Sequence, residues 1–488
     1  MFRLTAAVLC AAATLLGADD DLDSQMKSVI DAYAIVQQNA ADAATSEQVF
    51  YQGAIPGLLR RLDPHSVFFD PGQFEQLKRM ERATQKGFGS VVSLLPGRVI
   101  VLQTLPGTPS AKAGLAPGDE IVAVNGYIIN RLDLEQLTEL LTESRQQQAQ
   151  LEVRSPGSSG IKHLVLTPEE MQAASVERAF FIGAGIGYIR VASFDEKTSG
   201  QLKEAIEKLG GDRMAGLVLD LRNNPGGLLT AALETCSLIL QPGSKIVTVR
   251  GRNVPEKSEV VPSIATPYGF KLAILINEKT ASASEIVSGA AQDHDRAAII
   301  GQPSFGKGLV QSVFPLSDGT GLALTTALYY TPSGRSIQKP LDAAKFELGA
   351  ATAHPNTQRE FRTDKGRVVT GGGGIQPDVV VYPPATNRLR AVLDASGSFT
   401  NFATEYLRKN KVTADFEVTP QTIDEFRVFL SERDIQPGMA EWSVEREFID
   451  NRLKTEIFNQ AFGVEKGDEV EAQRDPVILK ALEVLGEQ

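Results

Sequence analysis

The sequence predicts an α/β core that is preceded by a β-rich region and flanked by helical regions at both ends. Between about residues 180 and 335, apolar strand-like runs alternate with helical patterns, which is typical of an α/β domain. Short strands and turns dominate from about 83 to 167, whereas 24–80 and the stretch from about 386 onward carry the apolar spacing of helices. A chain of 488 residues is long enough for several domains.

The α/β core is expected to contain a buried sheet, because its strand candidates are apolar along their whole length. The strands are 185–191, 216–222, 271–277 and 297–301, and the helices between them are 199–209, 228–240 and 281–292. A hairpin is expected next, with strands over 309–316 and up to about 331. We expect an irregular surface excursion over 340–373.

The β-rich region and the chain ends carry weaker patterns. Strands are expected at 98–103, 120–126, 150–155 and 161–167, with a helix at 133–141; amphipathic helices are expected at 54–62, 74–80, 401–407 and 423–430.

Composition excludes several classes of protein. The net charge of −11 and the lack of a basic run argue against a nucleic-acid binder, and 42% hydrophobic residues argue against general disorder. The four histidines, His65, His163, His294 and His354, show no metal-ligand spacing, so we expect neither a metal nor another cofactor. Cys236 lies in an apolar run, where a buried inert thiol is more typical than a nucleophile.

Residues 1–18 have the layout of a secretory signal: one basic residue, a short apolar stretch, and acidic residues directly after it. An uncleaved anchor is the alternative. No other run is apolar and long enough to cross a bilayer. We therefore expect export to the periplasm or the extracellular space, with no membrane span in the mature chain.

The stretch 301–311, GQPSFGKGLVQ, resembles a phosphate-binding loop but lacks two of its requirements. Such a loop opens into a helix and carries Ser or Thr after its lysine. Here Gly308 stands at that position, and a strand pattern follows. Lys307 and Gln311 fall on the same face of that strand. The lysine therefore needs a role other than phosphate binding.

Ser282 lies where an apolar strand turns into a helix, beside unpaired N–H groups and the positive end of the helix dipole. These groups, including the Ala283 N–H, would stabilise an oxyanion if Ser282 attacked a carbonyl. The structural alternative is a helix cap, with Glu285 completing a capping box.

A nucleophilic serine needs a base, and Lys307 is the candidate. Burial would make its amine neutral; bringing its pKa from about 10.4 to about 7 costs roughly 4.6 kcal/mol, which requires a largely buried position. Phe305 would supply apolar cover, and Gln311 would accept a hydrogen bond from the amine. The structural alternative is a solvated loop lysine.

The segment 216–227, GLVLDLRNNPGG, supplies a glycine turn after an apolar strand. It is an ordinary tight turn in the structural interpretation. In the functional interpretation, Gly226 or Gly227 directs an N–H toward the same oxyanion as the Ala283 N–H.

Four segments in this order, GLVLDLRNNPGG, NEKTASASEI, GQPSFGKGLVQSVFPL and YYTPSGRSIQ, resemble the carboxy-terminal processing peptidases of family S41. The resemblance implies a crotonase-like or ClpP-like core, with Ser282 as nucleophile, Lys307 as general base and Gln311 orienting the lysine. It also implies a Ser-Lys dyad that acts through an acyl-enzyme.

Residues 83–167 resemble a PDZ domain through KGFGS and TPSAKAGLAPGDEIVAVNG. PDZ domains bind a C-terminal carboxylate on successive backbone N–H groups and add the tail as an extra strand. The resemblance implies that Gly87, Phe88 and Gly89 form the carboxylate loop, with the groove between the next strand and the helix 133–141.

Together these features predict a signal peptide (1–18), a helical region (19–82), a PDZ domain (83–167), a protease core (168–385, including the excursion 340–373) and a C-terminal helical region (386–488). We expect an exported serine endopeptidase that binds substrate C-termini and cleaves near them, with PDZ movement gating Lys307 as a hypothesis. An adaptor or regulator protein and, by analogy, a homodimer are possible partners. One alternative is a catalytically retired PDZ adaptor, which the presence of both Ser282 and Lys307 disfavours. Another is a crotonase-type CoA enzyme, which the export signal and the PDZ pattern disfavour.

Overall fold

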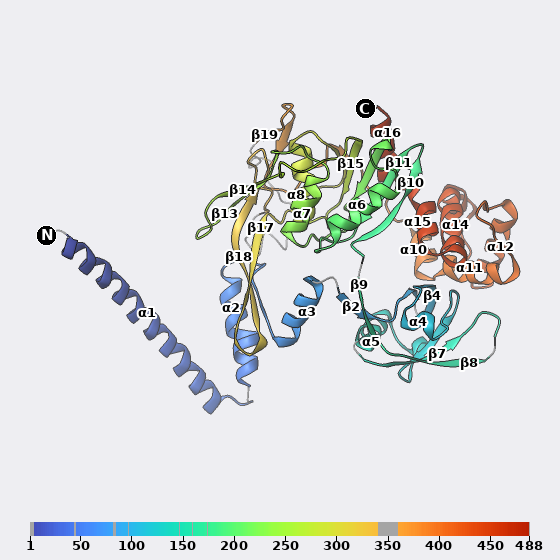
Figure 1. Ribbon diagram of the computed structural model, residues 1–488. Helices are drawn as coiled ribbons and strands as arrows, with labels where there is room; N and C mark the ends of the chain where they lie inside the picture. The colour runs from blue at the N-terminus through green and yellow to red at the C-terminus, as the bar shows by residue number, and fades with distance from the viewer. Residues whose placement is uncertain are drawn as a thin grey trace. The chain divides into compact units, whose positions relative to one another are not determined.

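The computed structural model describes residues 4–42, 45–81, 84–95, 97–145, 147–158, 160–172, 174–339 and 360–487. The chain divides into two compact units, one made of Met1–Pro71 with Val313–Leu324 and the other of Gly72–Ser312 with Thr325–Gln488. Figure 1 labels many of the elements of these units.

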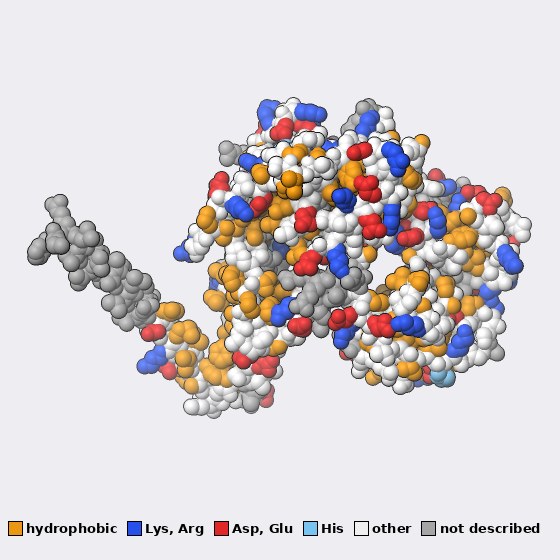
Figure 2. Space-filling view, in the orientation of Figure 1, with side chains coloured by type: hydrophobic (Ala, Val, Ile, Leu, Met, Phe, Trp, Pro, Cys, Tyr) orange, Lys and Arg blue, Asp and Glu red, His pale blue; other side chains and the backbone are white. Residues whose placement is uncertain are grey.

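The first unit is mainly helical. It contains α1 (Leu4–Asn39), a π-helix η1 (Gln48–Ala54), α2 (Ile55–Arg60) and β1 (Val67–Phe69). The strand β1 was not expected; it pairs antiparallel with the start of β18 (Gly321–Tyr330). Hydrophobic side chains are exposed on the described part of α1, as Figure 2 shows: Leu22, Met26, Val29, Ile30, Ile35 and Val36. Among the described residues, no helix has both the length and the apolar character needed to cross a membrane.

The β-rich region forms one antiparallel sheet in the order β3-β4-β5-β7-β8. The bounds are β3 (Ser90–Leu95), β4 (Arg98–Thr104), β5 (Glu120–Val124), β6 (Tyr127–Ile128), β7 (Ala149–Arg154) and β8 (Ile161–Leu166), with α4 (Pro109–Lys112) and α5 (Leu134–Ser144). Asp133 caps α5, and Gln136 completes the capping box. The strand β2 (Thr84–Gly87) precedes this sheet in the chain and pairs with β9 (Glu169–Gln172), which follows it. The four strands and the helix expected here are confirmed.

The α/β core contains a six-stranded sheet in the order β10-β11-β12-β15-β16-β21. The strands are β10 (Val176–Gly183), β11 (Ile186–Val191), β12 (Gly216–Asp220), β15 (Lys271–Ile276), β16 (Ala298–Gly301) and β21 (Val379–Val380). All neighbouring pairs are parallel except β10 with β11. Ligand and catalytic loops in such sheets follow the carboxyl ends of the strands.

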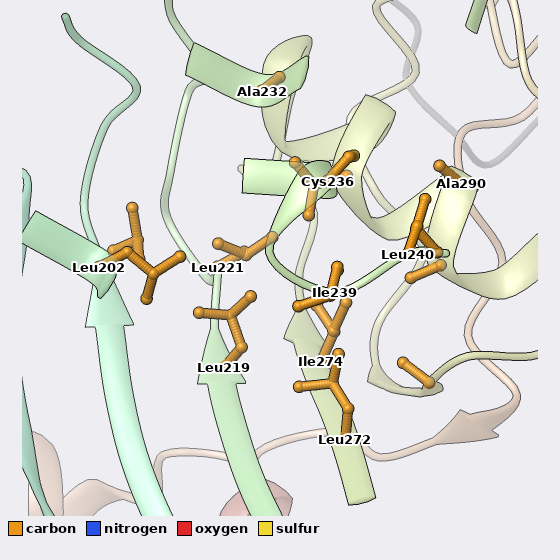
Figure 3. Packing of buried hydrophobic residues seen from close by; sticks show 14 of the residues in the cluster. Leu202, Leu219, Leu221, Ala232, Cys236, Ile239, Leu240, Leu272, Ile274 and Ala290 are labelled. Carbon is orange, nitrogen blue, oxygen red and sulfur yellow. The ribbon is translucent and has the colours of Figure 1, made fainter. Parts of the chain in front are cut away.

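Side chains alternate along these strands, so the sheet is apolar on both faces. On one face, α6 (Thr198–Lys208), α7 (Leu229–Ser237) and α8 (Ala283–Asp293) pack against residues such as Leu219 and Ile274. Figure 3 shows this packing around Cys236. On the other face, α16 (Pro476–Glu487) packs against residues such as Val218. The predicted alternation of strands and helices is confirmed, although α7 ends at Ser237 and not at 240.

The hairpin expected after the core is confirmed as β17 (Leu309–Pro315) and β18. The end of β18 pairs with β13 (Lys245–Arg250), which pairs with β14 (Lys257–Val260). Residues 340–359 of the predicted excursion lie outside the described residues. The prediction of an irregular segment is wrong for 360–370, because β19 (Glu360–Arg362) and β20 (Val368–Thr370) pair around a turn in which Gly366 has φ 84°.

The C-terminal region is helical, as predicted. Its helices are α10 (Arg388–Ala395), α11 (Ser398–Lys409), α12 (Pro420–Ser431), α13 (Met439–Val444), α14 (Arg446–Phe462) and α15 (Val464–Ala472), followed by α16. They have an aromatic core of their own, in which Phe402 and Phe426 lie edge to face.

Candidate active site

Ser282 lies in the turn between β15 and α8, with φ 54° and ψ −115°. This backbone conformation is strained for a residue with a Cβ and costs of order 1–3 kcal/mol. Hydrogen bonds on both sides hold it: the Ala281 N–H donates to the Asn224 carbonyl (3.0 Å), and the Glu285 N–H donates to the Ser282 carbonyl (2.8 Å). Ser282 and Glu285 also form the capping box that was the structural alternative for this serine, so the turn caps α8 as well as presenting Ser282.

Glu285, in the first turn of α8, is fully buried and links the two predicted reacting residues. One carboxylate oxygen accepts from the N–H groups of Ser282 (2.8 Å) and Lys307 (2.9 Å). The other accepts from the Ser304 hydroxyl (2.5 Å) and the Gly306 N–H (2.7 Å). Burial raises the pKa of Glu285, whereas these hydrogen bonds oppose the rise. The carboxylate therefore joins the backbone of Ser282 to the backbone of Lys307.

Lys307 precedes β17, and its Nζ donates to Gln311 Oε1 at 2.6 Å. The contact that the sequence predicted between these side chains is present. Lys307 is neither fully buried nor exposed, and the same holds for Phe305, so the burial predicted for the lysine is met in part. Glycines flank Lys307 on both sides, and the segment after β18 packs closely against the first of them. A Cβ at Gly306 would meet the Lys339 side chain.

Tyr329 was not anticipated from the sequence. It is buried on β18, and its hydroxyl lies within hydrogen-bond distance of the carbonyls of Lys307 (2.8 Å) and Ser282 (3.2 Å). Burial raises its pKa well above the ordinary value, so the hydroxyl is a donor at neutral pH. Tyr329 is thus a second link between the two loops.

The glycine turn lies directly against Ser282. A Cβ built on Gly226 would be 2.8 Å from the Ser282 Cβ and 2.8 Å from the Ala283 N, so no larger residue fits there. The Gly226 N–H donates to Asn224 Oδ1 (2.9 Å). Among the described residues, the N–H groups of Gly227 and Ala283 have no acceptor.

The predicted carboxylate loop joins β2 to β3. Gly89 has φ 75°, and a Cβ there would lie 2.3 Å from the Thr108 side chain. The carbonyls of Phe88 and Gly89 accept from Ser110 (2.9 Å) and Leu105 (2.8 Å). Within the described ranges, the N–H groups of Phe88 and Gly89 have no backbone acceptor. These bonds turn the two carbonyls back into the domain.

The remaining candidates are not near this chemistry. Cys236 is fully buried in α7, and burial raises the pKa of its thiol far above the ordinary value. His294 ends α8, where its ring nitrogens lie 2.7 Å from Asp364 Oδ2 and 2.7 Å from the Lys245 carbonyl. No group of three potential metal ligands lies together in the part of the chain that the structure describes.

Comparisons with known proteins bear on what this site does. The model of peptidase family S41 matches residues 185–344, and the PDZ model matches 77–154. A carboxy-terminal-processing protease of Bartonella bacilliformis is 36% identical over 297 residues, which cover 60% of this chain and 68% of the relative. The chain belongs to peptidase family S41. Members of this family are serine peptidases, and this one is a carboxy-terminal-processing protease with a PDZ domain.

Two further curated relatives of this S41 peptidase are also named as processing peptidases or proteases. Carboxyl-terminal-processing peptidase 2 of Arabidopsis thaliana chloroplasts is 34% identical, over 60% of this chain and 58% of the relative. A processing protease of Synechocystis is 34% identical, over 59% and 68%. Among solved structures, a photosystem II D1 C-terminal processing protease is 26% identical over 74% of this chain and 90% of that chain, with a TM-score of 0.40.

Proposed function

We propose that this S41 peptidase cleaves proteins near their free C-termini with a Ser282–Lys307 dyad. The neutral Lys307 amine accepts the Ser282 proton as Oγ attacks the scissile carbonyl. The resulting oxyanion accepts hydrogen bonds from the N–H groups of Gly227 and Ala283. The C–N bond then breaks, the Lys307 ammonium returns the proton to the leaving amine, and the acyl-enzyme is hydrolysed by water.

The observation that carries this proposal is the double link between the two residues. Glu285 accepts from both backbone N–H groups, and the Tyr329 hydroxyl lies within hydrogen-bond distance of both carbonyls. An isolated helix cap would not require a distant lysine loop to be tied to the same carboxylate. Gln311, which accepts from the Lys307 amine without adding charge, supports its role in orienting the base.

For the oxyanion hole we favour Gly227 over Gly226. The Gly226 N–H is already used by Asn224. Gly226 instead supports the proposal by its missing side chain, because a Cβ there would collide with Ser282. An oxyanion donor of this kind is worth about 10²–10³ in kcat.

We further propose that the PDZ domain supplies the substrate. A tail carboxylate would bind the N–H groups of the Gly87–Phe88–Gly89 loop, and the tail would pair with β3. The strand β3 is suited to this pairing because it is the edge strand of its sheet. Whether binding also moves the domain and gates Lys307 remains our hypothesis.

Digestion of an unstructured, apolar-ended polypeptide tests the function, with the products identified by mass spectrometry. We expect cuts near the C-terminus by the wild type and none by Ser282→Ala or Lys307→Ala. Binding without cleavage by the wild type would instead indicate a PDZ adaptor, and turnover of an acyl-CoA thioester would indicate a crotonase-type enzyme.

We also propose that residues 1–18 are an export signal that is cleaved from the mature protein. Sequencing the N-terminus of the protein recovered from its native compartment tests this, and retention of Met1 in the mature protein would contradict it. The homodimer and the adaptor partner stay predictions, and light scattering of the purified protein tests the first.

A further inference from the structure

The turn that carries Gly226 and Gly227 begins at Arg222, and carboxylates hold the Arg222 guanidinium from two sides. Asp220, at the end of β12, accepts from Nε (3.0 Å) and Nη2 (2.6 Å). Asp475 accepts from Nη1 at 2.7 Å. The first partner is a near neighbour in the chain, whereas the second comes from the last segment of the chain.

Asp475 stands directly before α16 and uses its two oxygens for different tasks. Oδ1 accepts from the N–H groups of Val477 (2.8 Å) and Ile478 (3.1 Å), so it caps the helix. Oδ2 binds Arg222. Because α16 packs along the face of the sheet, one carboxylate fixes the start of that helix and the start of the glycine turn together.

The rest of the turn is tied to the loops of the core. Asn223 exchanges two hydrogen bonds of 2.9 Å with Asn277, which lies between β15 and Ser282. The side chain of Asn224 donates to the Val191 carbonyl (2.8 Å) and accepts from Gly226. These bonds set the shape of the turn from within the sheet, and Asp475 adds a tether from the helix behind the sheet.

Packing alone does not hold Arg222 in this position. A pocket of about 290 Å³ lies beside it, lined by Arg222, Asp475, Arg178, Asp468 and Asn223 among others. Side chains next to open space can adopt other rotamers, so charge and hydrogen bonding must select this one. Both partners are about one-fifth exposed, which leaves the pair only weakly screened.

We propose that Asp475 is a positioning residue for the peptidase reaction, fixing through Arg222 the turn that supplies the oxyanion donor. This inference rests on the proposed function, because it assumes that the Gly227 N–H binds the oxyanion. We expect Asp475 to affect the transition state rather than substrate capture. It contacts the turn through Arg222 and is not among the predicted peptide-binding residues.

The test is Asp475→Asn, which keeps a helix-capping side chain and removes the charge that binds Arg222. We expect kcat to fall about tenfold, less than for outright loss of an oxyanion donor, with KM within twofold of the wild type. The affinity for a peptide aldehyde, whose adduct with serine carries the same oxyanion, should fall by the same factor as kcat. Asp475→Ser, which also caps a helix, should show the same losses if the Asn variant fails to fold.

Asp468→Asn is the matched control. It breaks an ion pair with Arg178 at the same pocket, on the helix before α16, but Asp468 has no bond to the turn. We expect its kinetics to equal those of the wild type. Unchanged kcat in Asp475→Asn, equal losses in both variants, or an aldehyde affinity that does not follow kcat would overturn the inference. If Ser282→Ala keeps full activity, the proposed function itself is wrong, and this outcome is distinct from the others.

Discussion

At the scale of single residues, the site depends on a few buried polar atoms that hold a strained serine. A non-glycine residue at φ 54° persists only when its surroundings fix it. Glu285 does most of this work, because its carboxylate accepts four hydrogen bonds, one from Ser282 and three from the loop 304–307. The strained backbone of Ser282 and the hydrogen bonds that hold it lie in the same turn. A nucleophile must be held in place at this position.

Replacing Glu285 by Gln tests this arrangement. The amide offers one oxygen, so two of the four buried donors lose their acceptor, at about 1–3 kcal/mol each. We expect a loss of about 2–6 kcal/mol in unfolding free energy and a fall in kcat, measured by urea titration and steady-state kinetics. A variant as stable and active as the wild type would show that the carboxylate is dispensable.

Comparing the wild type with Glu285→Gln also tests how stability depends on pH. The pKa of Glu285 is raised in the folded state, so the folded protein binds this proton more tightly than the unfolded chain does. The wild type should therefore lose stability as pH rises from the ordinary glutamate pKa through the raised pKa, and Glu285→Gln should lack this slope. Urea titrations between about pH 4.5 and 7 measure the difference; a wild type that gains stability relative to the variant over this range would contradict the sign.

Gly89 offers a residue-scale test of tail binding. Gly89→Ala places a Cβ 2.3 Å from Thr108 at φ 75°, so the loop must shift. Gly114→Ala is the control, because Gly114 has a similar φ of 80° but open space around it. We expect at least a tenfold weaker affinity for a tail peptide in the first variant alone, by fluorescence anisotropy. Equal effects would mean that backbone strain, and not loop shape, was measured.

At the scale of elements, α8 is anchored at both ends. Its first turn carries Glu285, and its last carries Asp293, which pairs with Arg335 at 2.8 Å with both side chains almost fully buried. Arg335 also donates to Gln292 (2.7 Å), the preceding residue of the helix. The segment after β18 thereby holds the end of the helix that begins beside the predicted nucleophile.

We predict that Arg335→Met destabilises the protein by about 3–5 kcal/mol, because it leaves the Asp293 carboxylate buried without its partner. Lys208→Met is the control: it removes an exposed pair with Glu204 on α6 and should cost less than about 0.5 kcal/mol. Thermal and urea unfolding measure both. Similar small losses in the two variants would show that the buried pair does not anchor α8.

At the scale of the whole molecule, the sequence predicts the order of the domains better than it predicts the site. Period and apolarity are local properties, so the alternating core, the β-rich region and the C-terminal helices could be derived from them. Ser282 was recognisable for the same reason, as a serine at a strand-to-helix turn. The four bonds of Glu285, by contrast, come from residues as far as 22 positions later in the chain, and Asp475 lies 253 positions from Arg222.

Some features could not be predicted because they depend on tertiary structure. How far Lys307 is buried is decided by the segments that pack over it, and the structure leaves it partly buried. The hairpin β19–β20 was missed because its strands are only three residues each, too short for a period to be visible. Tyr329 gave no signal, since a tyrosine on a strand is ordinary and only the fold brings it to both loops.

A whole-molecule prediction follows from coupling tail capture to cleavage. A substrate whose C-terminus is amidated lacks the carboxylate that the PDZ loop would bind, so we expect its KM to rise about tenfold or more while its kcat changes little. Steady-state kinetics with matched acid and amide peptides measure this. Equal KM values would contradict capture through the terminal carboxylate.

The central claim is that Lys307 activates Ser282, and covalent trapping tests it most directly. The protein is treated with a fluorophosphonate at neutral pH, and the adduct is located by peptide mass spectrometry in the wild type and in Lys307→Met. We predict a single phosphonyl adduct on Ser282 in the wild type and at least a hundredfold slower labelling in the variant, in keeping with the loss of a general base. Labelling at another residue, or an equal rate on Ser282 in both proteins, would contradict the account.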